Sequence, residues 1–329
     1  MPESLRHARH GRDKLLAYLQ LVRAPNVFTA AADVTTGYLF VNGTLEPLPL
    51  FLCLLIASCL LYAAGMVLND VYDVDVDARQ RPQRPLPSGR ISASWAKWLG
   101  FELLLLGAVL AWLSGYLYPG FAAVPYRPGL VATLLALSVV AYDAALKYTP
   151  LGCLAMGACR MFNLLLGMSA ARVMAGGAEE GPATLGFTSA QLAAAVGIGV
   201  YITGVTWFAR REAQAGHRWQ LAAATAVMLG GIAVLAALPS FSGIEPRFAA
   251  IDMWRLLLGL LALVIARRCL MAVVQPVPER MQAAVKLAIM SLIVLDAAIC
   301  LLVAGPLWAL AVLALLVPAN LLGRWIYST

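Results

Sequence analysis

Charged residues are scarce in this sequence. Asp, Glu, Lys and Arg make up 12% of its 329 residues, and hydrophobic residues make up 61%. In soluble globular proteins about a quarter of the residues are charged and about half are apolar. The composition therefore excludes an ordinary soluble globule and predicts a polytopic membrane protein.

The sequence also lacks the residues of a zinc site or a disulfide framework. It has three histidines, and none of its six cysteines forms a C-x-x-C pair. The cysteines fall inside apolar segments or at their ends, which predicts that they pack as small side chains. They are Cys53, Cys59, Cys153, Cys159, Cys269 and Cys300.

Long polar segments are missing as well. No loop between the apolar segments is long enough for a soluble domain, so we expect one membrane domain over residues 1–329, with residues 1–14 as a polar tail. Arg23 and Pro25 interrupt the first apolar segment, which argues against a removable signal peptide.

Apolar segments recur along the whole chain, each long enough to cross about 30 Å of hydrocarbon as a helix. They predict an all-α transmembrane bundle of about nine or ten helices. Gly305 and Pro306 leave open whether the last segment is a separate span or the far side of a kink. The segments are 21–41, 48–68, 96–118, 128–145, 151–174, 188–209, 219–239, 252–272, 282–303 and 306–322.

The positive charges are distributed unequally between the two sides of this bundle. All Lys and Arg except Arg127, Arg172, Arg247 and Arg255 lie in the N-terminal tail, in alternate loops, at the C-terminus or in helices at that end. The positive-inside rule then places both termini and the charged loops in the cytoplasm. The membrane that we expect is a bacterial inner membrane. The net charge of +7 is mostly a signal of this topology, with some attraction to anionic membrane lipids, and it gives no reason to expect nucleic acid as a partner.

An acidic motif, "NDVYDVDVD", follows the second apolar segment. If the helix continues past the membrane edge, Asp70, Asp73 and Asp77 share one face, whereas Asp75 points elsewhere and is solvated. Like charges at this spacing repel each other, and a divalent cation would compensate for the repulsion. Carboxylate oxygens and substrate phosphates together suit Mg²⁺, so Mg²⁺ is the predicted cofactor.

A proline-rich basic stretch, "RQRPQRPLPSGR", comes next and carries four arginines, including Arg81 and Arg84. Guanidinium groups bind phosphate oxygens in a fork and stay charged at any physiological pH. Acids for a metal beside arginines for phosphate predict a site for a diphosphate. The alternative is a mixed-charge loop that only stays soluble and sets the topology.

The two motifs together resemble the UbiA superfamily of intramembrane prenyltransferases. Asn69, Asp70, Asp73 and Asp77 fit the N-D-x-x-D-x-x-x-D pattern of that family, and "RPQRPLPSGRIS" is similar to its continuation. The resemblance implies that the aspartates hold Mg²⁺ on an isoprenyl diphosphate. Ionisation would then give an allylic cation that a lipophilic acceptor captures, in many members an aromatic ring.

Two weaker motifs extend the resemblance. Arg23 and Asn26 form an R-x-x-N pair at the first span, and Tyr142 and Lys147 form a Y-x-x-x-x-K pair after the fourth. In the family these positions line the site or meet the diphosphate. For the first pair, a snorkelling arginine with a capping asparagine is the alternative.

Charged side chains also occur within the apolar segments. Arg160 and Asn163 lie one turn apart in the fifth span, where a buried arginine is a candidate for substrate binding. The alternative for Arg160 is a structural ion pair with Asp33 or Asp296. Asp33 is expected to face the bundle interior and to have a partner there.

The second acidic motif of the family is altered here. The loop after the sixth span reads "FARREAQAGHR", in which Glu212 can take the place of the first acid and Arg211 lies beside it. Either one carboxylate with extra arginines supports catalysis, or this chain has lost or changed the chemistry.

The predicted function is Mg²⁺-dependent transfer of an isoprenyl group from a prenyl diphosphate to a lipophilic, aromatic acceptor within the membrane. A catalytically silent lipid-binding or scaffold subunit is the main alternative, and a transporter is the other. The predicted catalytic residues are Asp70, Asp73, Asp77, Lys147 and Glu212, with Asp70, Asp73, Asp77 and Glu212 as metal ligands. The predicted substrate-binding residues are Arg23, Asn26, Asn69, Arg81, Arg84, Tyr142, Arg160, Asn163 and Arg211.

Overall fold

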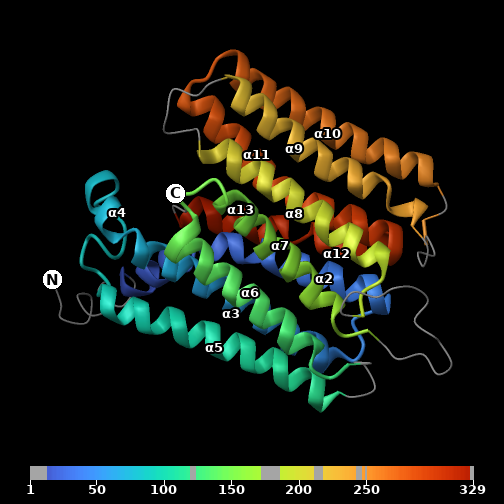
Figure 1. The fold of residues 1–329 in the computed structure, drawn as a ribbon, viewed down its shortest axis with the longest axis horizontal. Coiled ribbons are helices and arrows are strands. Elements are labelled where there is room, and N and C mark those ends of the chain that lie inside the picture. The colour runs from blue at the N-terminus through green and yellow to red at the C-terminus, as the bar shows by residue number, and fades with distance from the viewer. Residues whose placement is uncertain are drawn as a thin grey trace, which may run out of the picture.

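The structure is a computed structural model that describes residues 13–118, 124–171, 186–210, 218–241, 247–248 and 250–326. Within these ranges the chain is a bundle of helices without any β-strand (Figure 1). The predicted all-α class is confirmed, and a helix occurs at each of the ten predicted spans.

The first half of the chain contributes the helices around the acidic motif and on both sides of the basic loop. A helical segment over residues 13–21 precedes them. They are α2 (Ala24–Asn42), α3 (Leu48–Tyr72), α4 (Val74–Gln80), α5 (Ala93–Leu117), α6 (Arg127–Ala141) with a π-helical turn η2 (Tyr142–Leu146), and α7 (Gly152–Met168).

The second half adds further helices, and its final apolar segment consists of two short helices. Gly305, with a φ of 96°, lies between α11 and the final segment. The final segment packs back against α11, so it is not the continuation of a kinked helix. The elements are α8 (Ser189–Arg210), α9 (Arg218–Ala236), η3 (Leu238–Ser240), α10 (Ile251–Val274), α11 (Pro278–Val303), α12 (Pro306–Leu313) and α13 (Leu316–Trp325).

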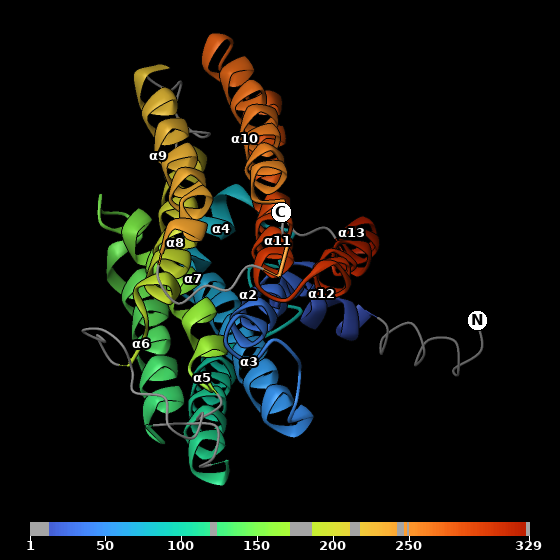
Figure 2. The same cartoon turned by 90° about the vertical axis from the view of Figure 1, so that its right-hand side faces the viewer.

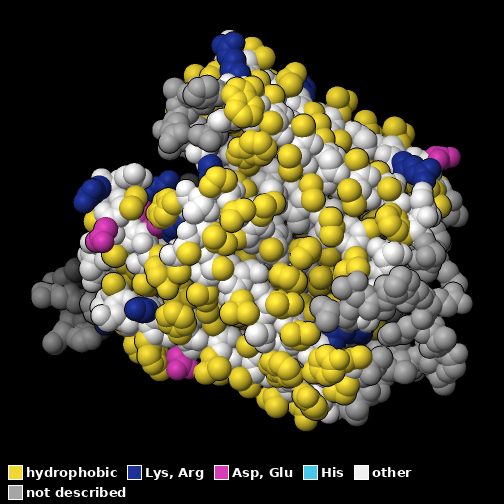
Figure 3. Space-filling model, viewed as in Figure 1, with side chains coloured by type: hydrophobic (Ala, Val, Ile, Leu, Met, Phe, Trp, Pro, Cys, Tyr) yellow, Lys and Arg dark blue, Asp and Glu magenta, His cyan; other side chains and the backbone are white. Residues whose placement is uncertain are grey.

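Eight helical segments of the described chain are long and apolar enough to cross a membrane; α2 and the shorter α7 are not among them. The outer surface agrees with this, because hydrophobic side chains cover the centre of the face in Figure 3 and charged ones lie toward its periphery. Together these features make the chain a multi-pass integral membrane protein.

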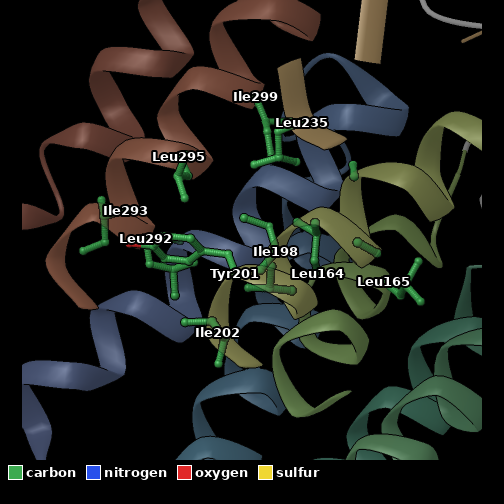
Figure 4. Close-up of a cluster of buried hydrophobic side chains, with 14 of the residues drawn as sticks. Leu164, Leu165, Ile198, Tyr201, Ile202, Leu235, Leu292, Ile293, Leu295 and Ile299 are labelled. Carbon is green, nitrogen blue, oxygen red and sulfur yellow. The ribbon is translucent and has the colours of Figure 1, made fainter. Parts of the chain in front are cut away.

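The helices α2 and α7 lie in the middle of the bundle. Helix α7 packs against α2, α6 and α8, and α2 also packs against α3, α11 and α13. Helices α9 and α10 extend beyond the rest at one side of the bundle in Figure 2. The buried cluster in Figure 4 joins α7, α8, α9 and α11. Within it the Tyr201 hydroxyl donates to the Ala288 carbonyl at 2.8 Å.

Helices α2 and α7 approach each other closely because both have glycine at the crossing. A Cβ atom added at Gly37 would lie 2.2 Å from the Leu164 carbonyl oxygen, and one at Gly167 would lie 2.2 Å from that of Val34. The clashing atoms belong to the backbone, so no side chain can rotate away. The crossing fixes the position of α2, which carries part of the site described below.

We expect Gly37→Ala to reduce stability by about 1–3 kcal/mol, since overpacking at a backbone contact forces the two helices apart. Thermal unfolding in detergent measures the effect. The matched control is Gly259→Ala on α10, where nothing lies within 4 Å of the added Cβ, so the melting temperature should stay the same or rise. Equal melting temperatures for the two variants would contradict the proposed close packing.

Candidate active site at one end of the bundle

The acidic and basic motifs meet at the end of the bundle where α4 projects (Figure 1). The Asp70 carboxylate lies 3.2 Å from Arg23 Nη2 and 3.5 Å from Arg84 Nη1. Arg84 Nη1 also contacts Asp77 Oδ2 at 2.6 Å. Arg84 thus connects two carboxylates of the acidic motif. Arg23, which precedes the first residue of α2, connects that helix to Asp70.

The predicted single face of three aspartates is wrong, because the helix does not continue past the membrane edge. Helix α3 ends at Tyr72, Asp73 caps it, and α4 begins at Val74. Asp70 and Asp77 turn toward Arg84, whereas Asp73 contacts Lys147 Nζ at 2.5 Å. Because of this break, the Asp70 and Asp77 side chains point toward the basic loop, and the Asp73 side chain points toward the loop after α6.

Lys147 and Tyr148 hold Asp73 from that second loop. Lys147 is buried, and the Tyr148 hydroxyl donates a hydrogen bond to Asp73 Oδ1. Partial burial, the hydrogen bond to Asp73 and the charge of nearby Asp77 raise the pKa of Tyr148 to about 12. The phenol therefore stays protonated at neutral pH and remains a hydrogen-bond donor beside the charged cluster.

Arg23 has an unusual backbone conformation for an arginine. Its φ of 47° and ψ of 52° lie in the left-handed region, which costs a non-glycine residue about 1–3 kcal/mol. The conformation is compensated by contacts, since the guanidinium donates to both Asn69 Oδ1 at 3.3 Å and Asp70 Oδ1 at 3.2 Å. Strain at this position agrees with the functional role predicted for Arg23.

The loop after α8 begins beside the same charged cluster. Arg210 is the last residue of α8, and its Nη1 donates to the Thr149 carbonyl at 2.6 Å. Thr149 lies two residues after Lys147 in the sequence. The predicted convergence of the loops after the second, fourth and sixth spans is confirmed as far as Arg210. Glu212 and Arg211 lie outside the described residues, and their predicted roles stay predictions.

A cavity of about 340 Å³ opens beside the charged cluster, and we call the end of the cavity at this cluster its mouth. Its inner walls are mainly apolar and come from α3, α6, α7, α8 and α11. The volume falls in the range of about 300–1,000 Å³ that is usual for small-molecule sites. Six of the predicted substrate-binding residues line it: Arg23, Asn26, Asn69, Tyr142, Arg160 and Asn163.

One polar group in the cavity wall is built around Arg160. Its Nη1 donates to Asp33 Oδ2 at 2.9 Å, and its guanidinium lies over the Tyr62 ring, 5.4 Å from the centroid. Asn163 donates to the same Asp33 oxygen at 3.0 Å and accepts from Ser58 at 2.7 Å. Asp33 thus has the predicted interior partner, and the structural alternative for Arg160 is present together with its place in the cavity wall.

A family model decides the relationship of this chain to known proteins. The model described as "UbiA prenyltransferase family" matches residues 30–272, well over half of the chain. The chain belongs to the UbiA prenyltransferase family.

Individual UbiA relatives match shorter stretches. A digeranylgeranylglyceryl phosphate synthase of Sulfolobus acidocaldarius is 39% identical over 108 residues, which cover 33% of this chain and 39% of the relative. A protein of the same name from Ignicoccus hospitalis is 36% identical over 165 residues, 50% of each chain. The chain matches no more than half the length of these relatives.

Solved UbiA structures share the fold over nearly the whole chain. A UbiA homologue from Archaeoglobus fulgidus bound to GPP and Mg²⁺ has a TM-score of 0.61 and 16% identity, covering 91% of this chain and 99% of that one. A structure of a digeranylgeranylglyceryl phosphate synthase has a TM-score of 0.60 and 19% identity, covering 92% of this chain and 99% of that one. At these identities the likeness shows the fold alone.

The donor chemistry of the mouth fits a hard divalent cation. Asp70 and Asp77 are buried and Asp73 is half-buried, and carboxylate oxygens are the ligands that Mg²⁺ prefers. Arginine and lysine side chains neutralise all three in this structure. Among the described residues, no three His, Cys, Asp or Glu side chains lie close enough to hold a metal ion by themselves. A diphosphate would have to supply the remaining oxygens and draw the cationic side chains toward itself.

Two further positions lie at or near the site, and the predicted substrate-binding role of Arg81 stays a prediction. Arg81 is exposed, and its side chain makes no ion pair with the described part of the chain, unlike Arg84. Asp143 has no role assigned from the sequence, yet it is 5% exposed and lines the cavity. Its position directly after Tyr142 in "YDAALKY" was the available signal.

Proposed function

We propose that this UbiA protein transfers an isoprenyl group from a prenyl diphosphate to a lipophilic acceptor in the membrane. One observation carries the proposal: the charged cluster and the apolar cavity share Arg23 and Asn69 in their walls. A diphosphate at the cluster would therefore place its prenyl chain in the cavity, which suits a substrate with one charged and one apolar end.

In this proposal Asp70, Asp73 and Asp77 would hold Mg²⁺, with Glu212 as a further ligand. The metal supplies positive charge to the leaving diphosphate when bound. Arg23, Arg84 and Lys147 contact these acids, and they would bind phosphate oxygens as negative charge develops on the leaving group. The apolar walls would exclude water, so that the acceptor captures the allylic cation.

The acceptor that we propose is a lipophilic molecule with a hydroxyl-bearing head group. A hydroxylated aromatic ring, as the family resemblance suggests, has this chemistry, and so does a glyceryl phosphate, as the names of the relatives suggest. Apart from Arg160, whose charge Asp33 balances, and the acidic Asp143, the interior of the cavity carries mainly apolar side chains. It therefore suits the apolar part of either acceptor.

We further propose that residues 1–329 act as one unit with the mouth facing the cytoplasm. Packing of α13 on α2 supports the first point, since the final helix contacts the helix that carries Asp33. The positive-inside distribution supports the second. The bacterial inner membrane remains a prediction from the sequence, because the relatives described above are archaeal.

Calorimetry and product analysis test this function on the purified protein in lipid nanodiscs. We expect geranyl diphosphate to bind with Mg²⁺ and not with EDTA. We also expect mass spectrometry to find a prenylated product with either a hydroxyaryl acceptor or a prenylglyceryl phosphate, which separates the two acceptor types. Absence of binding would overturn the proposal. Tight Mg²⁺-dependent binding without product from any acceptor would favour the silent scaffold instead.

A further inference from the structure

Asp143 is the only acidic side chain among the described residues that line the cavity. The aspartates of the first motif lie at the mouth, outside the cavity lining, and each is neutralised by an arginine or lysine. Asp143 is 5% exposed and makes no ion pair within the described ranges. Lys147 and Arg23 act on it electrostatically, but neither is within ion-pair distance. A buried carboxylate that faces a substrate cavity without such a contact calls for a chemical explanation.

The local backbone is what turns Asp143 toward the cavity. Residues Tyr142–Leu146 form a π-helical turn, closed by the hydrogen bond from the Lys147 N–H to the Tyr142 carbonyl at 2.9 Å. Single π-helical turns inside α-helices occur frequently at functional sites. Here the turn lets Tyr142 and Asp143 both line the cavity while Lys147 contacts Asp73.

The contacts of Asp143 fix one oxygen and leave the other available. Asn69 Nδ2 donates to Asp143 Oδ1 at 2.8 Å, and Arg23 in turn orients Asn69 by donating to its Oδ1 at 3.3 Å. Asp143 Oδ2 has no hydrogen-bond partner in the described part of the chain. Lys147 does not compete for it as an ion-pair partner, since its ammonium group is held by Asp73.

We infer that Asp143 is the general base that takes the proton lost by the acceptor. The inference rests on the proposed function and adds to it a residue that the family motifs do not include. In the transfer, the bond between the prenyl C1 carbon and the diphosphate oxygen breaks, and the diphosphate leaves with the electron pair. A new bond forms between that carbon and the acceptor, and the acceptor proton moves to Asp143 Oδ2.

The position of Asp143 also provides an exit for that proton. Hydrogen bonds through Asn69 to Arg23 hold the carboxylate close to the charged mouth, although these two side chains do not themselves carry the proton. From this end of the cavity, water or the departing diphosphate can receive the proton and return Asp143 to its charged form. Asp33 and Asp296 are fully buried and are not among the described residues that line the cavity, so they lack such access.

The test compares Asp143→Asn with wild type in single-turnover transfer from geranyl diphosphate to the acceptor that wild type uses. The amide keeps the size of the side chain and can still accept from Asn69. We expect the transfer rate at saturating substrate to fall about 10²-fold, the lower range for loss of a general base. Geranyl diphosphate affinity should change by less than about threefold, since the donor end is intact.

Two further variants separate a base from a structural residue. Asp143→Glu should recover part of the rate because it restores a carboxylate at a displaced position. Asp252→Asn, an exposed acid on α10, is the matched control and should behave like wild type. The fraction of geranyl diphosphate hydrolysed without transfer should rise in Asp143→Asn, because ionisation continues while the acceptor cannot lose its proton.

Each remaining outcome overturns a distinct statement. Wild-type transfer rates in Asp143→Asn would overturn the role as a base and leave the proposed function intact. Loss of geranyl diphosphate binding in Asp143→Asn would also overturn it and assign the residue to the donor end. Absence of transfer in wild type with any acceptor would overturn the proposed function, and the role of Asp143 would fall with it.

Discussion

Asp70→Asn is expected to remove Mg²⁺-dependent binding of a prenyl diphosphate and to lower prenyl transfer by about 10³-fold. The Asp70 side chain is 5% exposed and lies between Arg23 and Arg84, at 3.2 and 3.5 Å. An amide has the same size and cannot replace the negative charge. The substitution therefore removes both a proposed metal ligand and the group that orients two phosphate-binding arginines.

The protein itself should remain folded in this variant. Arg84 keeps its contact with Asp77 at 2.6 Å, and the Arg23 side chain is 25% exposed, so water can solvate the guanidinium that loses its partner. Calorimetry with geranyl diphosphate, with and without Mg²⁺, measures binding, and thermal unfolding verifies the fold.

The matched control for Asp70→Asn is Asp75→Asn. Asp75 belongs to the same motif but is exposed on α4 and makes no ion pair in the described chain. It should bind the diphosphate as wild type does. If Asp70→Asn binds geranyl diphosphate with undiminished Mg²⁺ dependence, the acidic motif is not the metal site and the proposed function loses its basis.

The sequence allows prediction of the features that depend on composition and spacing. Apolar runs locate the helices, because length and hydropathy alone decide whether a segment can cross a bilayer. Alternation of the loops between the two sides then predicts that the residues after the second and fourth spans meet. The contact between Lys147 and Asp73 confirms it.

The direction of individual side chains could not be predicted in the same way. The motif around Asp73 contains no proline or glycine to end the helix, yet α3 stops there, where Lys147 and Tyr148 hold the aspartate from 74 and 75 residues away in sequence. The π-helical turn that directs Asp143 inward likewise has no sequence signature. Tertiary contacts determine both features, and local patterns do not encode such contacts.

Arg160→Met should cost about 3–5 kcal/mol of stability, the range for breaking a buried ion pair by removing one partner. The Asp33 side chain is fully buried, and Arg160 Nη1 at 2.9 Å is its cationic partner. Asp296, also fully buried, is near enough to interact with Asp33 electrostatically. Without the guanidinium, the interior would hold two acidic groups and no compensating charge.

Thermal unfolding in detergent measures this loss, and two further variants define its origin. Arg255→Met is the matched control, since Arg255 is 46% exposed and lies 3.8 Å from a fully exposed Asp252, so its melting temperature should stay close to that of wild type. Combining Arg160→Met with Asp33→Asn should recover most of the stability, because no unpaired charge then remains at position 33.

The same variants decide between the two roles that the sequence leaves open for Arg160. A stability loss that Asp33→Asn reverses shows that the arginine is held as a structural partner, whatever it contacts in the cavity. If Arg160→Met instead unfolds like wild type but no longer binds the acceptor, the buried ion pair contributes little. Arg160 then acts in substrate recognition, with Asp33 and Tyr62 only holding its guanidinium in place.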